Sequence, residues 1–286
     1  MVATSKNPSR SAGAAAHPIL RALKARPCPA VMGVLNITPD SFSDGGAFLD
    51  PSLALAQAER MIAEGADLID IGAESTRPYG GAQAVSAEQE MERLRPVLAQ
   101  VIALGVPVSI DSMKAEVTAF ALDAGAVVAN DVWGLQRDGA MAALVAARNV
   151  PIIVMHNRDR ADPAIDIMRD IADYFARSLD IAARAGIPAE NIVLDPGIGF
   201  GKTAEQSMMA LARLAELKAF GLPLLVGASR KRFIASVVPS EPGERLGGSI
   251  AAHLIAAQNG ADIIRTHDVA ETVQALRVAA AIEDKA

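Results

Sequence analysis

Polar side chains end eight apolar segments that recur between residues 31 and 267 of this chain. Each segment is followed by a Gly-rich or polar loop and then by a helix-forming, mostly Ala-rich stretch. A buried parallel strand has no structural need for a polar last residue, and the carboxyl ends of parallel strands in a barrel lie together at one face. We therefore expect one site to contain Asn36, Asp70, Asp111, Asn130, His156, Asp195, Ser229 and Arg265.

Three of these residues could recognise the edge of a flat heterocycle. Asp111 and Asp195 end the apolar segments VSID and VLD. A carboxylate has two acceptor oxygens in one plane, which suit adjacent N–H donors such as the ring amide and exocyclic amine of a pterin. Asn130 adds both a donor and an acceptor. The alternative is that each residue only caps the helix that follows it.

Positive charges cluster after the seventh and eighth apolar segments. Residues 230–232 read RKR, and His267 follows Arg265 by two positions. Loops in these positions of a barrel commonly bind phosphate, and a guanidinium fork suits phosphate oxygens. Because the formal net charge is −6, we expect a local anion site rather than a general polyanion-binding surface. The alternative for residues 230–232 is a solvated run of charges.

Two long loops, residues 36–46 and 75–86, follow the first and second segments and mix Gly, Pro and polar residues. Such loops often carry active-site residues that move. Asn36 and Asp40 offer oxygen ligands for a hard cation such as Mg²⁺. The side chains that could close over a second substrate are Phe42, Thr76 and Arg77.

The glycine-rich segment LDPGIGFGKT (194–203) resembles a nucleotide-binding loop but lacks the required spacing. A P-loop needs a glycine where this chain has Pro196, and the dinucleotide fingerprint needs its third glycine one position after Gly201. No nucleophile elbow occurs either, so serine-hydrolase chemistry has no support. What remains is Asp195 followed by a turn that lets a ligand approach the backbone closely.

The alternation of segments predicts eight β/α units and a (β/α)8 TIM barrel, a fold of about 250 residues. A doubly wound open sheet is the alternative. The predicted strands are 31–36, 68–75, 106–111, 126–131, 151–156, 191–196, 223–229 and 261–267. The predicted helices are 52–63, with Ser52 as N-cap, 86–104, 114–124, 141–148, 165–185, 203–220, 249–259 and 271–282.

We expect one barrel domain over residues 30–286, preceded by a basic, flexible tail over residues 1–29 for which a transit peptide is the alternative. The single cysteine, Cys28, excludes an internal disulfide. No apolar run reaches the roughly 20 residues that span a bilayer, which indicates no membrane insertion and a cytoplasmic protein. Aromatic residues make up 3% of the chain, too few for a base-stacking nucleic-acid surface.

The order of several motifs resembles the dihydropteroate synthase family. These motifs are NITPDSFSDGG, ESTRP, SID, ND, LDPGIGFGK, GASRK and RTHD, and the resemblance runs from about Val31 to Ala280. The first and fifth motifs are the specific ones. Two departures are Ser112, where the family usually has threonine, and the insertion-like YGG at residues 79–81.

The resemblance implies condensation of 6-hydroxymethyl-7,8-dihydropterin pyrophosphate with 4-aminobenzoate, with Mg²⁺ as cofactor and a homodimer as assembly. It implies pterin contacts from Asp111, Asn130, Asp195 and Lys231, with Asp70 nearby. It implies pyrophosphate contacts from Asn36, which is also the metal ligand, Arg265 and His267. It implies aminobenzoate surroundings of Phe42, Thr76, Arg77, Pro78 and Ser229, and further substrate contacts from Phe200 and Gly227. The residues expected to act in catalysis are Asn36, Asp40, Thr76, Arg77, Lys231, Arg265 and His267.

Two other functions stay open on the sequence alone. One is a methyltransferase-type pterin-binding barrel, which would keep the ring contacts but has no use for NITPDSFSDGG or RTHD. The other is a non-catalytic pterin-binding subunit, which predicts losses at positions such as Thr76, Lys231 or Arg265, and none is seen. The individual roles of Asp70 and His156 do not follow from their positions.

Overall fold

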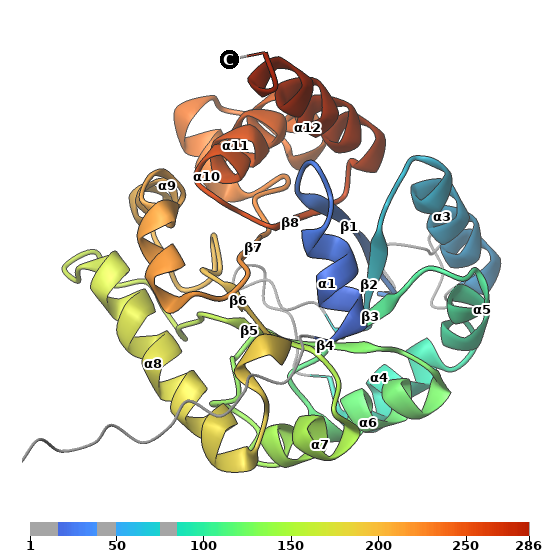
Figure 1. Ribbon diagram of the computed structural model, residues 1–286. Helices are drawn as coiled ribbons and strands as arrows, with labels where there is room; N and C mark the ends of the chain where they lie inside the picture. The colour runs from blue at the N-terminus through green and yellow to red at the C-terminus, as the bar shows by residue number, and fades with distance from the viewer. Residues whose placement is uncertain (1–16, 39–49, 75–84, 286) are drawn as a thin grey trace, which may run out of the picture.

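The structure is a computed structural model that describes residues 17–38, 50–74 and 85–285. Its eight strands pair in parallel in the order β6-β5-β4-β3-β2-β1-β8-β7. A parallel bridge between Leu194 and Leu224 joins the two ends of this order. Helices form an outer ring around the strands (Figure 1). The predicted barrel is therefore confirmed, and the open-sheet alternative is wrong.

The strands lie within or at the predicted segments, and most of their side chains are buried on both faces. They are β1 (Ala30–Asn36), β2 (Leu68–Gly72), β3 (Val108–Asp111), β4 (Val128–Asp131), β5 (Ile152–Met155), β6 (Ile192–Asp195), β7 (Leu225–Val226) and β8 (Ile263–Thr266). The α-helices are α1 (Pro18–Lys24), α3 (Pro51–Ala63), α4 (Ala87–Leu94), α5 (Leu98–Ala103), α6 (Ala115–Ala124), α7 (Met141–Arg148), α8 (Ile167–Ala185), α9 (Ala204–Ala212), α10 (Arg232–Val237), α11 (Leu246–Gln258) and α12 (Val269–Glu283). Short 3₁₀ segments are η1 (Ala189–Asn191), η2 (Leu214–Phe220) and η3 (Pro242–Glu244).

Local capping signals explain several helix ends. Ser86 caps α4 in a capping box, as its sequence suggests, and Gly125 ends α6 in the left-handed conformation that glycine adopts at little cost. The prediction of Ser52 as the cap of α3 is wrong. Asp50 is the N-cap, because Pro51 occupies the first helical position and the Asp50 carboxylate accepts the Ser52 N–H at 2.8 Å.

Two predicted helices are divided in the structure. The stretch 86–104 breaks between α4 and α5 at residues 95–97, where Pro96 lacks the N–H that a continuous helix needs. The stretch 203–220 changes from α9 to the tighter η2 after Ala212. The short helix α10 was not predicted, because it begins at the last residue of the charged run 230–232 and has too few turns to show a periodicity.

Helix α1 closes the amino-terminal end of the barrel, where the sequence predicted only tail. Leu20 is buried against the inward-facing strand residues Met32, Leu68 and Ile263. Figure 1 shows α1 within the ring of helices. Residues 18–24 of the predicted tail therefore form a helix that packs on the barrel, which the sequence did not indicate.

Most other buried apolar side chains lie between the strands and the outer helices. None of the described helices is long and apolar enough to cross a membrane.

Candidate active site

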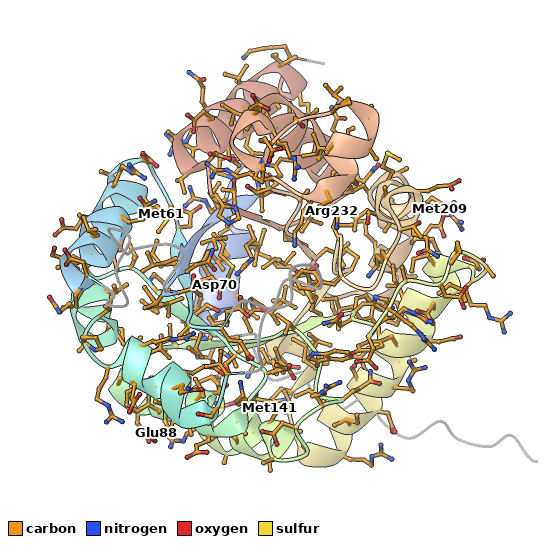
Figure 2. All side chains as sticks on the ribbon, turned by 180° about the vertical axis from the view of Figure 1, so that it is seen from behind. Met61, Asp70, Glu88, Met141, Met209 and Arg232 are labelled. Atoms are coloured by element: carbon orange, nitrogen blue, oxygen red, sulfur yellow. The ribbon has the colours of Figure 1, made fainter. Side chains whose placement is uncertain are left out.

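The polar strand ends gather at the carboxyl face of the barrel, as predicted. Asp111 pairs in register with Asn130 across β3 and β4, and Met155 pairs with Asp195 across β5 and β6. Asp70, Asp111, Asn130 and Asp195 are all buried. In Figure 2 Asp70 lies inside the ring of helices.

Arg265 joins two carboxylates at this face. Its Nε donates to Asp70 Oδ2 at 2.6 Å, and its NH2 donates to Asp111 Oδ2 at 2.7 Å. Asn130 Nδ2 also donates to Asp70 Oδ2, at 2.9 Å. We expected Arg265 to belong to a separate anion site, but in this structure it is part of the carboxylate cluster. Asp70 therefore has a role that the sequence did not reveal, which is to hold Arg265 and Asn130 in place.

Two carboxylate oxygens of this cluster lack a partner. Asp70 Oδ1 and Asp111 Oδ1 are buried and accept no hydrogen bond from the described residues. Buried acceptors are normally satisfied, and an unpaired one costs free energy. A ligand that brings its own N–H donors would supply the missing bonds.

Burial also changes the protonation of the site. It raises the pKa of Asp111 well above its usual range, although Arg265 opposes the shift, and it raises the pKa of Asp195 to about 6. Burial alone would lower the pKa of Arg265, but the carboxylates of Asp70 and Asp111 outweigh this effect and raise it. The site thus holds a fixed positive charge beside carboxyl groups that are costly to ionise.

Helix capping does not explain these strand ends. Lys114, Ala140 and Thr203 occupy the N-cap positions of α6, α7 and α9. Asp195 Oδ1 instead accepts the Gly197 N–H at 2.7 Å, which shapes the glycine-rich turn locally. The capping alternative is therefore wrong for Asp111, Asn130 and Asp195.

The cationic run 230–232 divides into three different environments. Lys231 Nζ lies 4.0 Å from the centroid of the Phe200 ring, which places it at the site. Arg230 pairs with Asp268, with Nε 3.1 Å from Oδ2, and its side chain is 40% exposed. Arg232 is exposed at the start of α10, and Figure 2 shows it away from Asp70. The solvated alternative is thus wrong for Lys231.

His267 is placed for hydrogen bonding rather than for carrying charge. Its Nδ1 lies 3.0 Å from Ser229 Oγ, which also accepts the His267 backbone N–H. Burial and the nearby Arg265 lower the pKa of His267 to about 3, so the imidazole is neutral at pH 7. The low pKa argues against the positive charge that the position of His267 beside Arg265 suggested.

A cavity of about 700 Å³ opens beside these groups. Among its lining residues are Gly199, Lys202, Ser229, Lys231, Phe233 and His267. Phe200, with Val132 and Met155, forms a small apolar cluster against which Trp133 packs. Gly227 leaves ordinary van der Waals space beside the Arg265 side chain.

Several predicted site residues cannot be placed. Asp40, Phe42, Thr76, Arg77 and Pro78 lie outside the described residues.

The predicted metal ligand Asn36 is half-buried at the end of β1. No group of three His, Cys, Asp or Glu side chains among the described residues could hold a metal ion by itself. One amide oxygen is nevertheless compatible with Mg²⁺, because this ion commonly takes few protein ligands and completes its shell with substrate phosphates and water.

The structure shows two networks that the sequence did not reveal. Lys114 pairs with Glu90 and, at 2.7 Å, with Glu74, which also accepts the Val85 N–H at 3.1 Å. These residues join both stems of the segment 75–84. His156 points away from the carboxylate cluster and contacts Lys202 and Asp170. Neither network has a signal in the sequence, because a charged residue within a helix, such as Glu90, is usually exposed.

Comparison with known proteins decides the family. The Pterin binding enzyme family matches residues 32–267, most of the chain. This chain belongs to that family. It is 44% identical over 256 residues to a dihydropteroate synthase of Bacillus subtilis, which covers 89% of both chains.

Two further pterin-enzyme relatives fit the same assignment. A crystal structure of the dihydropteroate synthase from Clostridium difficile in the presence of pteroic acid superposes with a TM-score of 0.85 at 44% identity, covering 89% of this chain and 97% of that one. A probable bifunctional folylpolyglutamate synthase/dihydropteroate synthase of Haloferax volcanii is 46% identical over 89% of this chain, which spans only 31% of that longer protein.

Proposed function

We propose that this pterin-binding enzyme is a dihydropteroate synthase. It condenses 6-hydroxymethyl-7,8-dihydropterin pyrophosphate with 4-aminobenzoate to give 7,8-dihydropteroate and pyrophosphate, a transferase reaction of folate synthesis. The observation that carries the proposal is the buried cluster of Asp70, Asp111, Asn130 and Arg265 with two unpaired acceptor oxygens. It occurs in a chain that is 44% identical to a dihydropteroate synthase over 89% of both chains. Neither alternative from the sequence has comparable support.

The carboxylates account for pterin recognition in this proposal. Asp111 Oδ1 and Asp70 Oδ1 are acceptors for the ring N–H and exocyclic amine. Asp195 lies at the end of β6, close enough for its field to reach Lys231 and Arg265. Where these carboxyl groups are ionised, they stabilise a positive charge that develops on the pterin as the leaving group departs.

The reaction then needs one bond broken and one formed. The bond from the pterin methylene carbon to the pyrophosphate oxygen breaks, and its electron pair leaves with pyrophosphate. The neutral aniline nitrogen attacks the methylene carbon and loses a proton, which the released pyrophosphate or water takes up. Neutral His267 and Ser229 share one hydrogen bond, 3.0 Å between Nδ1 and Oγ. The one proton that this bond leaves over, on Nε2 or on Oγ, can be donated to the departing anion. No covalent intermediate with the chain is required.

Mg²⁺ is proposed as the cofactor, with Asn36 as its protein ligand. When bound, the ion supplies positive charge that stabilises the leaving pyrophosphate. Asn36 at the end of β1 orients that end of the substrate, while Arg265 is held by Asp70 and Asp111.

A homodimer is proposed as the assembly, and the cytoplasm as the location. Large apolar side chains are exposed on α11 and α12, among them Ile255 at 46%, Val278 at 54% and Ile282 at 66%. These helices are neighbours in the outer ring (Figure 1), and a second copy of the chain would cover their apolar surface.

Pyrophosphate release tests the proposed activity. We expect release only when the dihydropterin pyrophosphate, 4-aminobenzoate and Mg²⁺ are all present. Omitting each component in turn is the control. Release that does not depend on 4-aminobenzoate would indicate a hydrolase, and pterin binding without any release would indicate a non-catalytic subunit.

A further inference from the structure

A buried lysine lies behind the glycine-rich loop that follows β6. Lys202 is 2% exposed. Its Nζ lies 2.6 Å from His156 Nδ1, 2.9 Å from the Gly197 carbonyl oxygen and 3.2 Å from the Phe200 carbonyl oxygen. An ammonium group has three N–H donors, so a protonated Lys202 can satisfy all three acceptors. Two of those acceptors belong to the loop that shapes the site.

His156 and Asp170 orient this lysine from the other side. His156 is fully buried, and its Nε2 lies 2.9 Å from Asp170 Oδ2. Because Nδ1 accepts from Lys202, the imidazole proton is on Nε2 and is donated to Asp170. Arg158 NH1 donates to the second Asp170 oxygen at 2.9 Å. The result is a row of groups whose donors and acceptors match, running from Arg158 through Asp170 and His156 to Lys202.

Close packing restrains the loop in addition to this row of hydrogen bonds. A Cβ at Gly197 would collide with the carbonyl oxygen of His156, and one at Gly201 would collide with Arg158. The His156 N–H also donates to the Asp195 carbonyl oxygen at 2.9 Å. The loop therefore packs on the end of β5, and small shifts of His156 or Lys202 would reach Asp195 and Phe200 directly.

We propose that Lys202, oriented by His156 and Asp170, is a positioning residue that holds residues 197–201 in the conformation in which Asp195 and Phe200 bind a pterin. This proposal rests on the proposed function. Its consequence is that protonated Lys202 supports pterin affinity by holding the loop in place rather than by recognising the ring.

The surroundings of Lys202 make this support sensitive to pH. Burial, together with the charges of Lys231 and Arg158, lowers the pKa of Lys202 to about 7, although Asp195 and Asp170 oppose the shift. His156 does not change charge in this range, because burial and Lys202 lower its own pKa to about 4. As the pH rises through 7, Lys202 loses a donor and its charge, so its hold on the loop weakens.

Calorimetric titration with 6-hydroxymethylpterin at pH 6, 7 and 8.5 tests the proposal. We expect Lys202→Met to raise the Kd about tenfold or more at pH 6, because it removes charged hydrogen bonds, and to raise it by a much smaller factor at pH 8.5. Taking the ratio to the wild-type chain at each pH cancels the titration of Asp111, on which Lys202 has no effect. Lys202 lowers the pKa of Asp195, so Asp195→Asn and Asp195→Asn/Lys202→Met are compared in the same way to separate that contribution. The matched control is Lys218→Met on the exposed side of η2, which should leave the Kd unchanged at every pH.

Two further measurements keep the proposal testable if Lys202→Met does not fold. His156→Asn should weaken pterin binding in the same pH-dependent way, because it breaks the link to Asp170. In ¹⁵N spectra of the histidine rings, His156 should carry its proton on Nε2 from pH 5 to 8.

Each adverse outcome has one meaning. Wild-type protein that binds no pterin contradicts the proposed function. If the wild-type chain binds pterin, two results overturn the role of Lys202. One is a Kd of the variants within twofold of the wild-type value, and the other is a Kd raised by the same factor at all three pH values. A proton on Nδ1 of His156 overturns it as well.

Discussion

At the scale of single residues, the buried carboxylates at the carboxyl face destabilise the fold and serve binding. Asp111 and Asp195 have raised pKa values because burial disfavours their charged forms. Both are therefore harder to ionise in the folded chain than in the unfolded chain. Such groups are retained where a ligand needs them, which makes their replacement a test of function as well as of stability.

Replacing Asp111 by asparagine should weaken pterin binding by about 1–3 kcal/mol, because an acceptor oxygen for a ring N–H becomes a donor. Calorimetry with 6-hydroxymethylpterin measures this. The control is Asp173→Asn on α8, an exposed carboxylate paired with Arg169, which should leave the pterin affinity unchanged. Unchanged affinity in Asp111→Asn would remove this residue from ring recognition.

Replacing Asp195 by asparagine should stabilise the ligand-free chain at pH 8 by about 1–3 kcal/mol. The pKa of Asp195 is about 6 in the folded chain and 3.8 in the reference state, so the unfolded chain releases its proton first. Wild-type stability therefore falls as the pH rises from about 4 to about 6 and gains nothing above that range from this group. Urea unfolding at pH 4 and pH 8 checks this, with the gain expected only at pH 8. A gain of equal size at both pH values would point to a cause other than ionisation.

Arg265→Met should lower the free energy of unfolding by about 3–5 kcal/mol at pH 8, because it leaves buried carboxylates without their cation. The loss should be smaller at pH 5, where protonation of Asp111 removes part of the uncompensated charge. Arg265→Ala should for the same reason weaken pterin binding as well as pyrophosphate binding, although the sequence alone suggested that it would spare the pterin. The exposed Arg277→Met on α12 is the control for denaturation.

At the scale of elements, helix α1 was not predicted from the sequence. Its sequence, PILRALK, is too short and too basic to stand out from the preceding residues. Its contribution comes from Leu20, which covers the amino-terminal end of the barrel core. The tertiary contact, rather than helix propensity, stabilises a helix of this length.

Leu20→Ala should destabilise the chain by about 2–5 kcal/mol through lost burial and the cavity left behind. Arg21→Ala, on the exposed face of the same helix, is the matched control and should change stability by less than about 0.5 kcal/mol. Thermal unfolding measures both. Deletion of residues 1–25, which the sequence assigns to a tail, should also lower the melting temperature. Equal melting temperatures for Leu20→Ala and Arg21→Ala would show that α1 is not needed for stability.

At the scale of the whole molecule, one closed barrel brings residues from every part of the chain to one face. Arg265 and Asp70 are separated by 195 positions in sequence and by 2.6 Å between Nε and Oδ2 in space. The outer surface of the barrel is not uniformly polar. Helices α11 and α12 carry exposed apolar side chains that the proposed dimer would cover.

Val278→Asp should convert the proposed dimer to a monomer, because it places a charge in an apolar contact. Light scattering coupled to size-exclusion chromatography measures the mass. Leu53→Asp on α3, which is 44% exposed on another part of the ring, is the control and should leave the dimer intact. A wild-type mass of one chain at micromolar concentration would contradict the homodimer itself.

The barrel and the strand-end site could be predicted because both depend on local patterns. Eight apolar segments with polar ends, separated by helix-forming stretches that end in glycine, indicate parallel strands whose ends meet. The identities of Asp111, Asn130 and Asp195 then limit the ligand to one with matching donors and acceptors. These conclusions need the order and spacing of residues, not their coordinates.

Only the tertiary structure decided which of these side chains bind one another. Arg265 contacts Asp70 and Asp111 rather than standing apart for an anion, and His156 turns away from the cluster toward Lys202. Side chains of a strand alternate between its two faces, so a shift of one residue in register moves a side chain to the other face. Burial and neighbouring charges set the protonation of each side chain, so one buried neighbour can change what that side chain does. The sequence by itself determined the fold and the set of groups at one face, while packing determined their pairing and protonation.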